Sequence, residues 1–229
     1  MSLIFNREIH KRYLSLLLSD IVKTFPERVA FKGGTCAALF YNLPRFSFDL
    51  DFDLLYMFSL SNISELKELL SRYGEIKDFY NKKYTLFFLF DYGKGYPKIK
   101  IELNKRVWKN NIYKPAWFLG VALSIAEEAT MLTNKIVALT ERKSPAVRDL
   151  YDSWYFLKAG YSLSDALIQE RTGKSKQEYL KSAASFIKKN YTSRNVLQGL
   201  GETLDDKQKI WAKAHLINET VTEIEKLII

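Results

Sequence analysis

The strongest fold signal in this chain is the segment Lys32-Gly33-Gly34-Thr35, followed by Arg45-Phe46-Ser47-Phe48-Asp49-Leu50-Asp51. It joins a glycine pair and a hydroxyl to two carboxylates in an apolar run that is typical of a β-strand. Alternation along a strand directs Asp49 and Asp51 to the same face, with Cα atoms about 6.5 Å apart. Two such carboxylates repel each other unless a cation lies between them, and Mg²⁺ favours oxygen ligands of this kind. We therefore predict that Asp49 and Asp51 are metal-binding catalytic residues, although an acidic edge strand has the same pattern.

The glycine pair precedes a helix that we expect over residues 35–41. Glycine lets the backbone approach a phosphate closely, and the N–H groups at a helix N-terminus attract negative charge. The two stretches together predict a site for nucleotide phosphates. Its expected nucleotide-binding residues are Lys32, Gly33, Gly34, Thr35, Arg45 and Ser47.

A third acid, Glu102, lies among alternating apolar residues in the second strand of a hairpin that we expect over residues 84–104. We predict that Glu102 approaches Asp49 and Asp51 across the sheet and serves as a third catalytic metal ligand. Three converging carboxylates suit phosphoryl chemistry with two metal ions. The alternative is that Glu102 pairs with Lys82 or Lys100 on a solvated face.

Two further stretches of the sequence carry charges inside helical patterns. Lys135 lies between apolar residues, where its ammonium group can reach a phosphate or remain at the surface. Asp149 and Asp152 are one helical turn apart, and Arg148 can pair with Asp152 at helical spacing. The residue pattern leaves two interpretations open: Lys135, Asp149 and Asp152 belong to a phosphate site, or Lys135 lies at the surface and the acids form a solvent-facing ion pair.

The composition limits the class of protein. The chain has 229 residues, 47% of them hydrophobic, and a net charge of +9. Its single cysteine excludes an internal disulfide framework and favours the reducing cytoplasm, and no apolar run is long enough to cross a membrane. The positive charge is concentrated in residues 80–114 and 155–200, which favours a polyanionic partner such as a nucleic acid.

Strand and helix patterns change along the chain. The first part alternates between the two, and from residue 119 onward the pattern is helical, beginning with a capping-box signal at Ser124 and Glu127. We therefore expect an α+β fold: a mixed-sheet α/β core over residues 1–118, followed by a helical C-terminal lobe over residues 119–229.

Four motifs, in this order, resemble those of the AbiEii-type nucleotidyltransferase toxins, a branch of the DNA polymerase β-like nucleotidyltransferase superfamily. That family has a strand, then Gly-Gly-Ser/Thr, then Arg-x-Ser-x-Asp-φ-Asp, where φ is apolar. Its later motifs match Lys135-Ile136-Val137-Ala138-Leu139 and Arg148-Asp149-Leu150-Tyr151-Asp152. The resemblance extends over about residues 28–158, and the last 70 or so residues carry no such motif.

The resemblance implies a nucleotidyltransferase core with a helical lobe, magnesium as the cofactor, and nucleoside triphosphates (NTPs) as substrates. It also implies a toxin of a toxin–antitoxin or abortive-infection system, with a cognate antitoxin as a partner. By position, Asp49 and Asp51 would be metal ligands, and Gly34 and Thr35 would contact the triphosphate. Lys135 and Asp149 would be catalytic residues of the nucleotide site, Lys135 by binding phosphate and Asp149 by helping to place the nucleotide or the acceptor, and Asp152 would also bind the nucleotide. Glu102 fills the place of the third carboxylate.

The sequence therefore predicts a cytoplasmic, magnesium-dependent enzyme that moves a nucleoside monophosphate (NMP) from an NTP to a nucleic-acid hydroxyl, the 3′ end of tRNA being the expected acceptor. Two alternatives stay open at this point. One is a nucleotide-binding regulatory protein without turnover, and the other is a nucleotidyltransferase that modifies a small molecule such as an antibiotic.

Overall fold

The computed structural model describes residues 6–142 and 146–228. The chain forms two compact units and passes between them several times. Unit 1 comprises the chain up to Phe40, Ser47–Val107 and Tyr113–Ala126. Unit 2 comprises Tyr41–Phe46, Trp108–Ile112 and the chain from Glu127 onward.

Unit 1 is built on a mixed seven-stranded sheet with the strand order β3-β4-β5-β2-β1-β7-β6. The central strand β2 runs antiparallel to β1 and parallel to β5, and β1 runs parallel to β7. The remaining neighbours are antiparallel hairpins. The strands are β1 (Val29–Lys32), β2 (Leu50–Leu54), β3 (Glu75–Asn81), β4 (Thr85–Asp91), β5 (Ile99–Asn104), β6 (Tyr113–Phe118) and β7 (Val121–Ala126).

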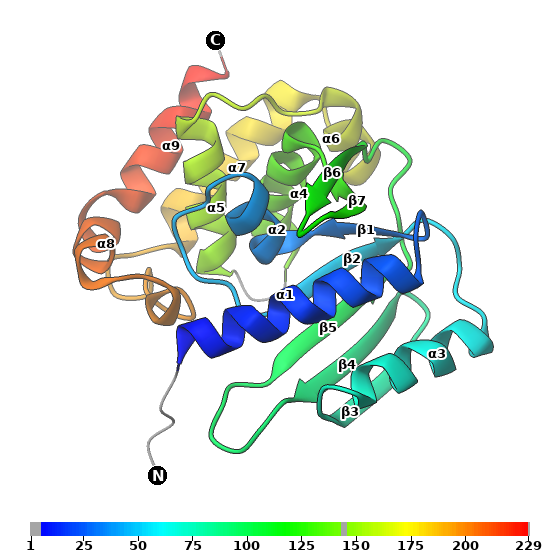
Figure 1. Ribbon diagram of the computed structural model, residues 1–229. Helices are drawn as coiled ribbons and strands as arrows, with labels where there is room; N and C mark the ends of the chain where they lie inside the picture. The colour runs from blue at the N-terminus through cyan, green and yellow to red at the C-terminus, as the bar shows by residue number, and fades with distance from the viewer. Residues whose placement is uncertain (1–5, 143–145, 229) are drawn as a thin grey trace. The chain divides into compact units, whose positions relative to one another are not determined.

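One face of this sheet is the apolar core of unit 1. Its strands alternate between buried and more exposed residues, and the buried set includes Phe31, Phe52, Phe88, Ile101 and Leu103. Helices α1 (Arg7–Thr24) and α3 (Leu60–Ser71) cover this face (Figure 1). Acids on neighbouring positions of β2 and β5 are thereby directed to the opposite face.

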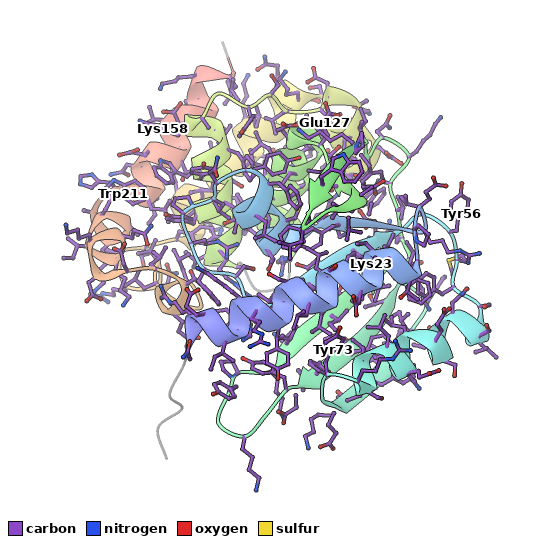
Figure 2. All side chains as sticks on the ribbon, in the orientation of Figure 1. Lys23, Tyr56, Tyr73, Glu127, Lys158 and Trp211 are labelled. Atoms are coloured by element: carbon purple, nitrogen blue, oxygen red, sulfur yellow. The ribbon has the colours of Figure 1, made fainter. Side chains whose placement is uncertain are left out.

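Helices α1 and α3 are also joined by a polar contact. Tyr73, labelled in Figure 2 just after α3, donates a hydrogen bond to the carboxylate of Asp20 on α1. Helix α3 begins with a capping box between Ser59 and Asn62, which satisfies backbone donors at its first turn. The short helix α2 (Gly33–Phe40) follows β1 directly and contacts both β1 and β2.

Unit 2 is helical. Its core is formed by side chains such as Leu132, Ile136, Leu150, Phe156 and Ile187, all of them fully buried. The elements are α4 (Glu128–Glu141), α5 (Val147–Lys158), α6 (Asp165–Thr172), α7 (Lys176–Asn190), a 3₁₀ turn η1 (Gly201–Thr203), α8 (Asp206–Trp211), a π-helical turn η2 (Ala212–Leu216) and α9 (Ile217–Lys226).

Two contacts fix the last helices of unit 2. Lys158 on α5 pairs with Glu219 and Glu223 on α9 at 3.6 and 3.7 Å. Trp211 packs against Trp154 with ring centroids 4.1 Å apart; Lys158 and Trp211 are both labelled in Figure 2. The C-terminal residues therefore complete the helical core of unit 2.

The α+β class agrees with the prediction, whereas the details near the predicted boundary differ. Residue 118 ends β6, so a division at 118/119 falls inside the β6–β7 hairpin, and unit 1 continues to Ala126. Ser124 pairs with Ala30 and Pro115 in the sheet, so the predicted capping box at Ser124 is wrong. The stretch Val121–Ala126 is a strand because pairing on both sides satisfies its backbone groups.

Candidate active site

The junction between β1 and α2 brings a glycine against a carboxylate. Lys32 ends β1 opposite Asp51 on β2, and Gly33 then turns the chain into α2 with a positive φ of +81°. A Cβ atom at position 33 would lie only 2.1 Å from Oδ2 of Asp51. Only glycine combines this backbone conformation with this close approach. The predicted phosphate-binding turn and the predicted metal ligand Asp51 are therefore neighbours in space.

Helix α2 also holds the backbone at Asp49. The Thr35 side chain is buried, and its hydroxyl donates a hydrogen bond of 2.5 Å to the main-chain carbonyl of Asp49. The Asp49 carboxylate accepts a hydrogen bond of 3.2 Å from the main-chain N–H of Lys100. In the structure Thr35 thus positions Asp49, and a contact between Thr35 and a nucleotide stays a prediction. Gly34 is buried within α2, and Ser47 is half-buried in the loop that leads to β2.

Glu102 lies beside Asp51. The two residues are partners in the parallel register of β2 and β5, so their side chains leave the same face of the sheet. Asp51 is half-buried and Glu102 is exposed. Sequence periodicity therefore placed Glu102 on the correct face, and its role as a third ligand stays a prediction.

The donor chemistry of this face fits a hard divalent cation, because carboxylate oxygens are the ligands that such cations prefer. Within residues 6–142 and 146–228, however, no three His, Cys, Asp or Glu side chains are grouped closely enough to form a ready-made metal site. A cation on Asp49 and Asp51 would thus take its other ligands from water and substrate phosphates, as Mg²⁺ commonly does.

Asp53, the next acid along β2, has a structural role. Its side chain is only 1% exposed and accepts hydrogen bonds from Lys32 Nζ at 2.6 Å, Asn104 Nδ2 at 2.8 Å and Tyr113 OH at 2.8 Å. Three donors offset the desolvation of a buried carboxylate. Lys32, which the sequence assigns to nucleotide binding, is paired with Asp53 in the structure, and its phosphate contact stays a prediction.

The other predicted site residues form a buried ionic network in unit 2. Lys135 Nζ lies 3.1 Å from Asp149 Oδ1 and 3.0 Å from Asp152 Oδ2. Arg45 forms a bidentate ion pair with Asp152, in which Nε lies 2.5 Å from Oδ1 and Nη2 lies 2.7 Å from Oδ2. Arg142 Nε lies 3.0 Å from Asp149 Oδ2. The structure brings together four residues that the sequence assigns to the nucleotide site, Arg45, Lys135, Asp149 and Asp152, and adds Arg142, and their contact with a nucleotide stays a prediction.

Electrostatic coupling keeps this network ionised. Burial alone would raise the pKa of Asp152, but Arg45 and Lys135 outweigh it and lower that pKa below its ordinary value. Burial alone would lower the pKa values of Arg45 and Lys135, but the negative charges of Asp152 and Asp149 outweigh burial and raise both pKa values above their ordinary values. The expected surface pair between Arg148 and Asp152 is therefore wrong, since Asp152 is fully buried against Arg45 and Lys135.

Tyr191 lies beside this network and was not predicted from the sequence. The Tyr191 hydroxyl is buried and finds no hydrogen-bond partner among the described residues. Burial, followed by the charge of Asp149, raises the pKa of Tyr191. No motif surrounds Tyr191, so the sequence offered no signal for its position near Asp149.

Comparison with known proteins assigns the chain to a family. The sequence model of the family described as "Nucleotidyl transferase AbiEii toxin, Type IV TA system" matches residues 16–214. The chain belongs to the AbiEii nucleotidyltransferase toxin family. The resemblance found in the motifs is thus confirmed, and the protein is a nucleotidyltransferase of a family of type IV toxin–antitoxin toxins.

Solved structures share the fold of this chain. JHP933 from Helicobacter pylori is similar with a TM-score of 0.55 and 16% sequence identity, covering 96% of this chain and 94% of its own. A second H. pylori protein, described as a candidate nucleotidyltransferase, has a TM-score of 0.55 and 19% identity, covering 97% of this chain and 96% of its own. A search of curated proteins found no match. Within the described residues, none of the AbiEii protein's helices is long and apolar enough to cross a membrane.

Proposed function

We propose that this AbiEii protein is a magnesium-dependent enzyme that transfers NMP from an NTP to the 3′-hydroxyl of an RNA, with tRNA as the acceptor. The observation that carries the proposal is the contact between Gly33 and Asp51. It joins a helix N-terminus, where backbone N–H groups favour phosphate, to Asp51, one of the two carboxylates that we propose as ligands of the divalent cation. Transfer of a nucleotide needs both functions at the same place.

The reaction is an in-line displacement. The acceptor 3′-oxygen attacks the α-phosphorus, a new P–O bond forms, the bond to the β-phosphate oxygen breaks, and pyrophosphate leaves. Magnesium, held by Asp49 and Asp51, would supply charge stabilisation for the phosphate oxygens. Glu102, in register with Asp51, would accept the proton of the attacking hydroxyl or orient that hydroxyl.

The backbone around Gly33 and Gly34 would bind the triphosphate at the start of α2. Lys135 would contribute a positive charge to phosphate binding, while Asp149 would orient the ammonium group of Lys135, 3.1 Å away. Lys32, Thr35, Arg45, Ser47 and Asp152 complete the residues that we assign to the nucleotide site.

We propose an RNA acceptor because of the net charge of the chain. A net charge of +9 attracts a polyanion and disfavours a cationic antibiotic. The type IV family implies an antitoxin as a further partner. We place the activity in the cytoplasm, where tRNA would be the acceptor.

The test is incubation of the full chain with Mg²⁺, bulk tRNA and each of the four α-³²P-labelled NTPs, with EDTA in a parallel reaction. We expect label on the tRNA with at least one NTP, and no label with EDTA. Equal labelling with EDTA would overturn the requirement for a divalent metal. Parallel reactions replace tRNA by tRNA-depleted RNA or by aminoglycosides, and label on those acceptors alone would reject tRNA.

A further inference from the structure

A stacked aromatic pair lies in the same row of the sheet as the acidic site. Asp51 on β2 is in register with Glu102 on β5, Glu102 with Phe87 on β4, and Phe87 with Tyr80 on β3. Residues in register share a face, so these four side chains form one row across four strands. At the other end of the row, Lys32 on β1 is in register with Asp51.

Phe87 and Tyr80 are not part of the apolar core. Their rings are parallel, with centroids 4.5 Å apart and planes 10° apart. Both are half-exposed, whereas their neighbours Phe88 and Phe90 are fully buried on the opposite face. Two stacked aromatic rings that are partly exposed beside an acid on the open face of the sheet offer an apolar surface to a ligand.

Basic side chains border this pair. Lys82 Nζ lies 4.4 Å from the ring centroid of Tyr80, and Lys83 and Arg106 lie over the ring of Tyr84 at 5.1 and 5.5 Å. Lys105 donates a hydrogen bond of 2.7 Å to the main-chain carbonyl of Lys82. Positive charge is therefore concentrated at the turn between β3 and β4 and after the end of β5, next to the stacked rings.

Partly exposed aromatic rings beside a cluster of positive charge are typical of sites for single-stranded nucleic acid, in which bases stack on the rings and phosphates contact the cations. Phe87 covers one face of Tyr80, so a base that stacks on Tyr80 would take the place of the Lys82 ammonium, whose charge would then contact a phosphate. A base-paired duplex offers no free base faces to such a surface. We propose that Tyr80 and Phe87, bordered by Lys82, Lys83, Lys105 and Arg106, form the platform that binds the unpaired 3′ end of the RNA acceptor. This inference deepens the proposed function and rests on it for the identity of the acceptor.

The order of residues along the row separates the acceptor from the NTP. Gly33 and the start of α2, where the triphosphate would bind, adjoin Asp51 on its β1 side. Phe87 and Tyr80 lie on its β5 side. Phe87 is two strand spacings, about 10 Å, from Asp51. At about 3.4 Å per stacked nucleotide, that distance places the bases stacked here about three nucleotides upstream of the reacting hydroxyl.

The test is direct binding, which needs neither NTP nor turnover. Fluorescence anisotropy with a 5′-labelled, 12-nucleotide single-stranded RNA would be measured for the full chain, with a blunt 12-base-pair RNA duplex as a competitor. The double variant Tyr80→Leu/Phe87→Leu keeps apolar bulk and removes the rings. We expect about 10-fold weaker binding of the single strand. Trp117→Leu, which removes an exposed ring on the outer strand β6, is the matched control and should bind like wild type.

A second variant guards against misfolding of the first. Lys82 is exposed, and Lys82→Gln should lower the slope of log K against log salt concentration by about 0.7. An unchanged affinity of the double variant, an unchanged salt slope of Lys82→Gln, or equal affinity of wild type for the single strand and the duplex would each overturn the platform.

Kinetics separate this inference from the proposed function. In the tRNA labelling reaction, the double variant should raise KM for tRNA about 10-fold and leave KM for the NTP unchanged. If the double variant labels tRNA with an unchanged KM for tRNA, the RNA platform is wrong and the proposed transfer activity still stands. Binding that depends on Tyr80 and Phe87, without any labelling by wild type, would reject the transfer activity and retain the platform.

Discussion

Arg45 and Asp152, which are 107 positions apart in the sequence, form a two-bonded ion pair in the core of unit 2. Each belongs to a motif that the sequence assigns to the nucleotide site. Both side chains are buried, and Asp152 also holds Lys135. Asp152 is therefore the shared counterion of two buried cations.

Removal of this counterion should destabilise the protein. Asp152→Asn leaves Arg45 and Lys135 without their common partner, and breaking a buried ion pair costs about 3 kcal/mol or more. We expect a loss of this size in the free energy of unfolding, measured by urea denaturation. Glu225→Gln is the matched control, since its pair with Lys188 is exposed and should contribute less than about 1 kcal/mol. Equal losses in the two variants would contradict a special role for Asp152.

Gly33→Ala should disturb the carboxylate of Asp51 as well as the backbone. A residue other than glycine at a positive φ costs roughly 1–2 kcal/mol. Gly120→Ala is the matched control: its φ is +78°, close to the +81° of Gly33, but its Cβ would meet no atom within 4 Å. Both variants should lose stability in thermal unfolding, Gly33→Ala more than Gly120→Ala because its Cβ also displaces Asp51, and only Gly33→Ala should lose nucleotide transfer. Full transfer activity in Gly33→Ala would show that the close approach to Asp51 is dispensable.

His10 should make stability depend on pH. It is buried on α1, with Nδ1 2.6 Å from Tyr92 OH and Nε2 donating to the carbonyl of Phe48 at 3.0 Å. Burial lowers the pKa of His10 below its ordinary value of 6.5, against the opposing effects of Phe48 and Asp49. The unfolded chain therefore takes up a proton first, and stability present above pH 6.5 is lost as the pH falls from there toward the folded pKa.

The check is urea unfolding between pH 7.5 and 5.5. His10→Gln, which can keep both hydrogen bonds, should show a smaller loss of stability on acidification than wild type. His215→Gln, at an exposed position in unit 2, should follow the wild-type curve. Parallel curves for wild type and His10→Gln would refute the assignment.

The local parts of the site could be predicted from the sequence because their signals are local. The glycine pair after a short strand, and the alternating acids and apolar residues of β2 and β5, each fix a turn or a face without knowledge of the rest of the chain. Glu102 was thereby placed beside Asp51. Strands β6 and β7 were not predicted. Tyr113–Phe118 contains Pro115, and proline is uncommon within strands, while Ser124 and Glu127 have the spacing of a helix capping box.

Long-range pairing could not be predicted in the same way. Nothing near Arg45 in the sequence indicates that its partner is Asp152, and the neighbouring Arg148 offered a plausible local partner instead. The stacked pair of Tyr80 and Phe87 likewise depends on the register of β3 and β4. Without that register, Phe87 is indistinguishable from the core residues Phe88 and Phe90 that follow it.

The most direct measurement is the rate of NMP transfer to tRNA by Asp51→Asn, which keeps the shape of the side chain and removes its charge. Asp78→Asn, an exposed position on β3, is the matched control, and the folded state of each variant is checked by thermal unfolding. We predict at least about 100-fold slower transfer by Asp51→Asn and a wild-type rate for Asp78→Asn. Transfer by a folded Asp51→Asn protein at the wild-type rate would contradict the catalytic role of Asp51.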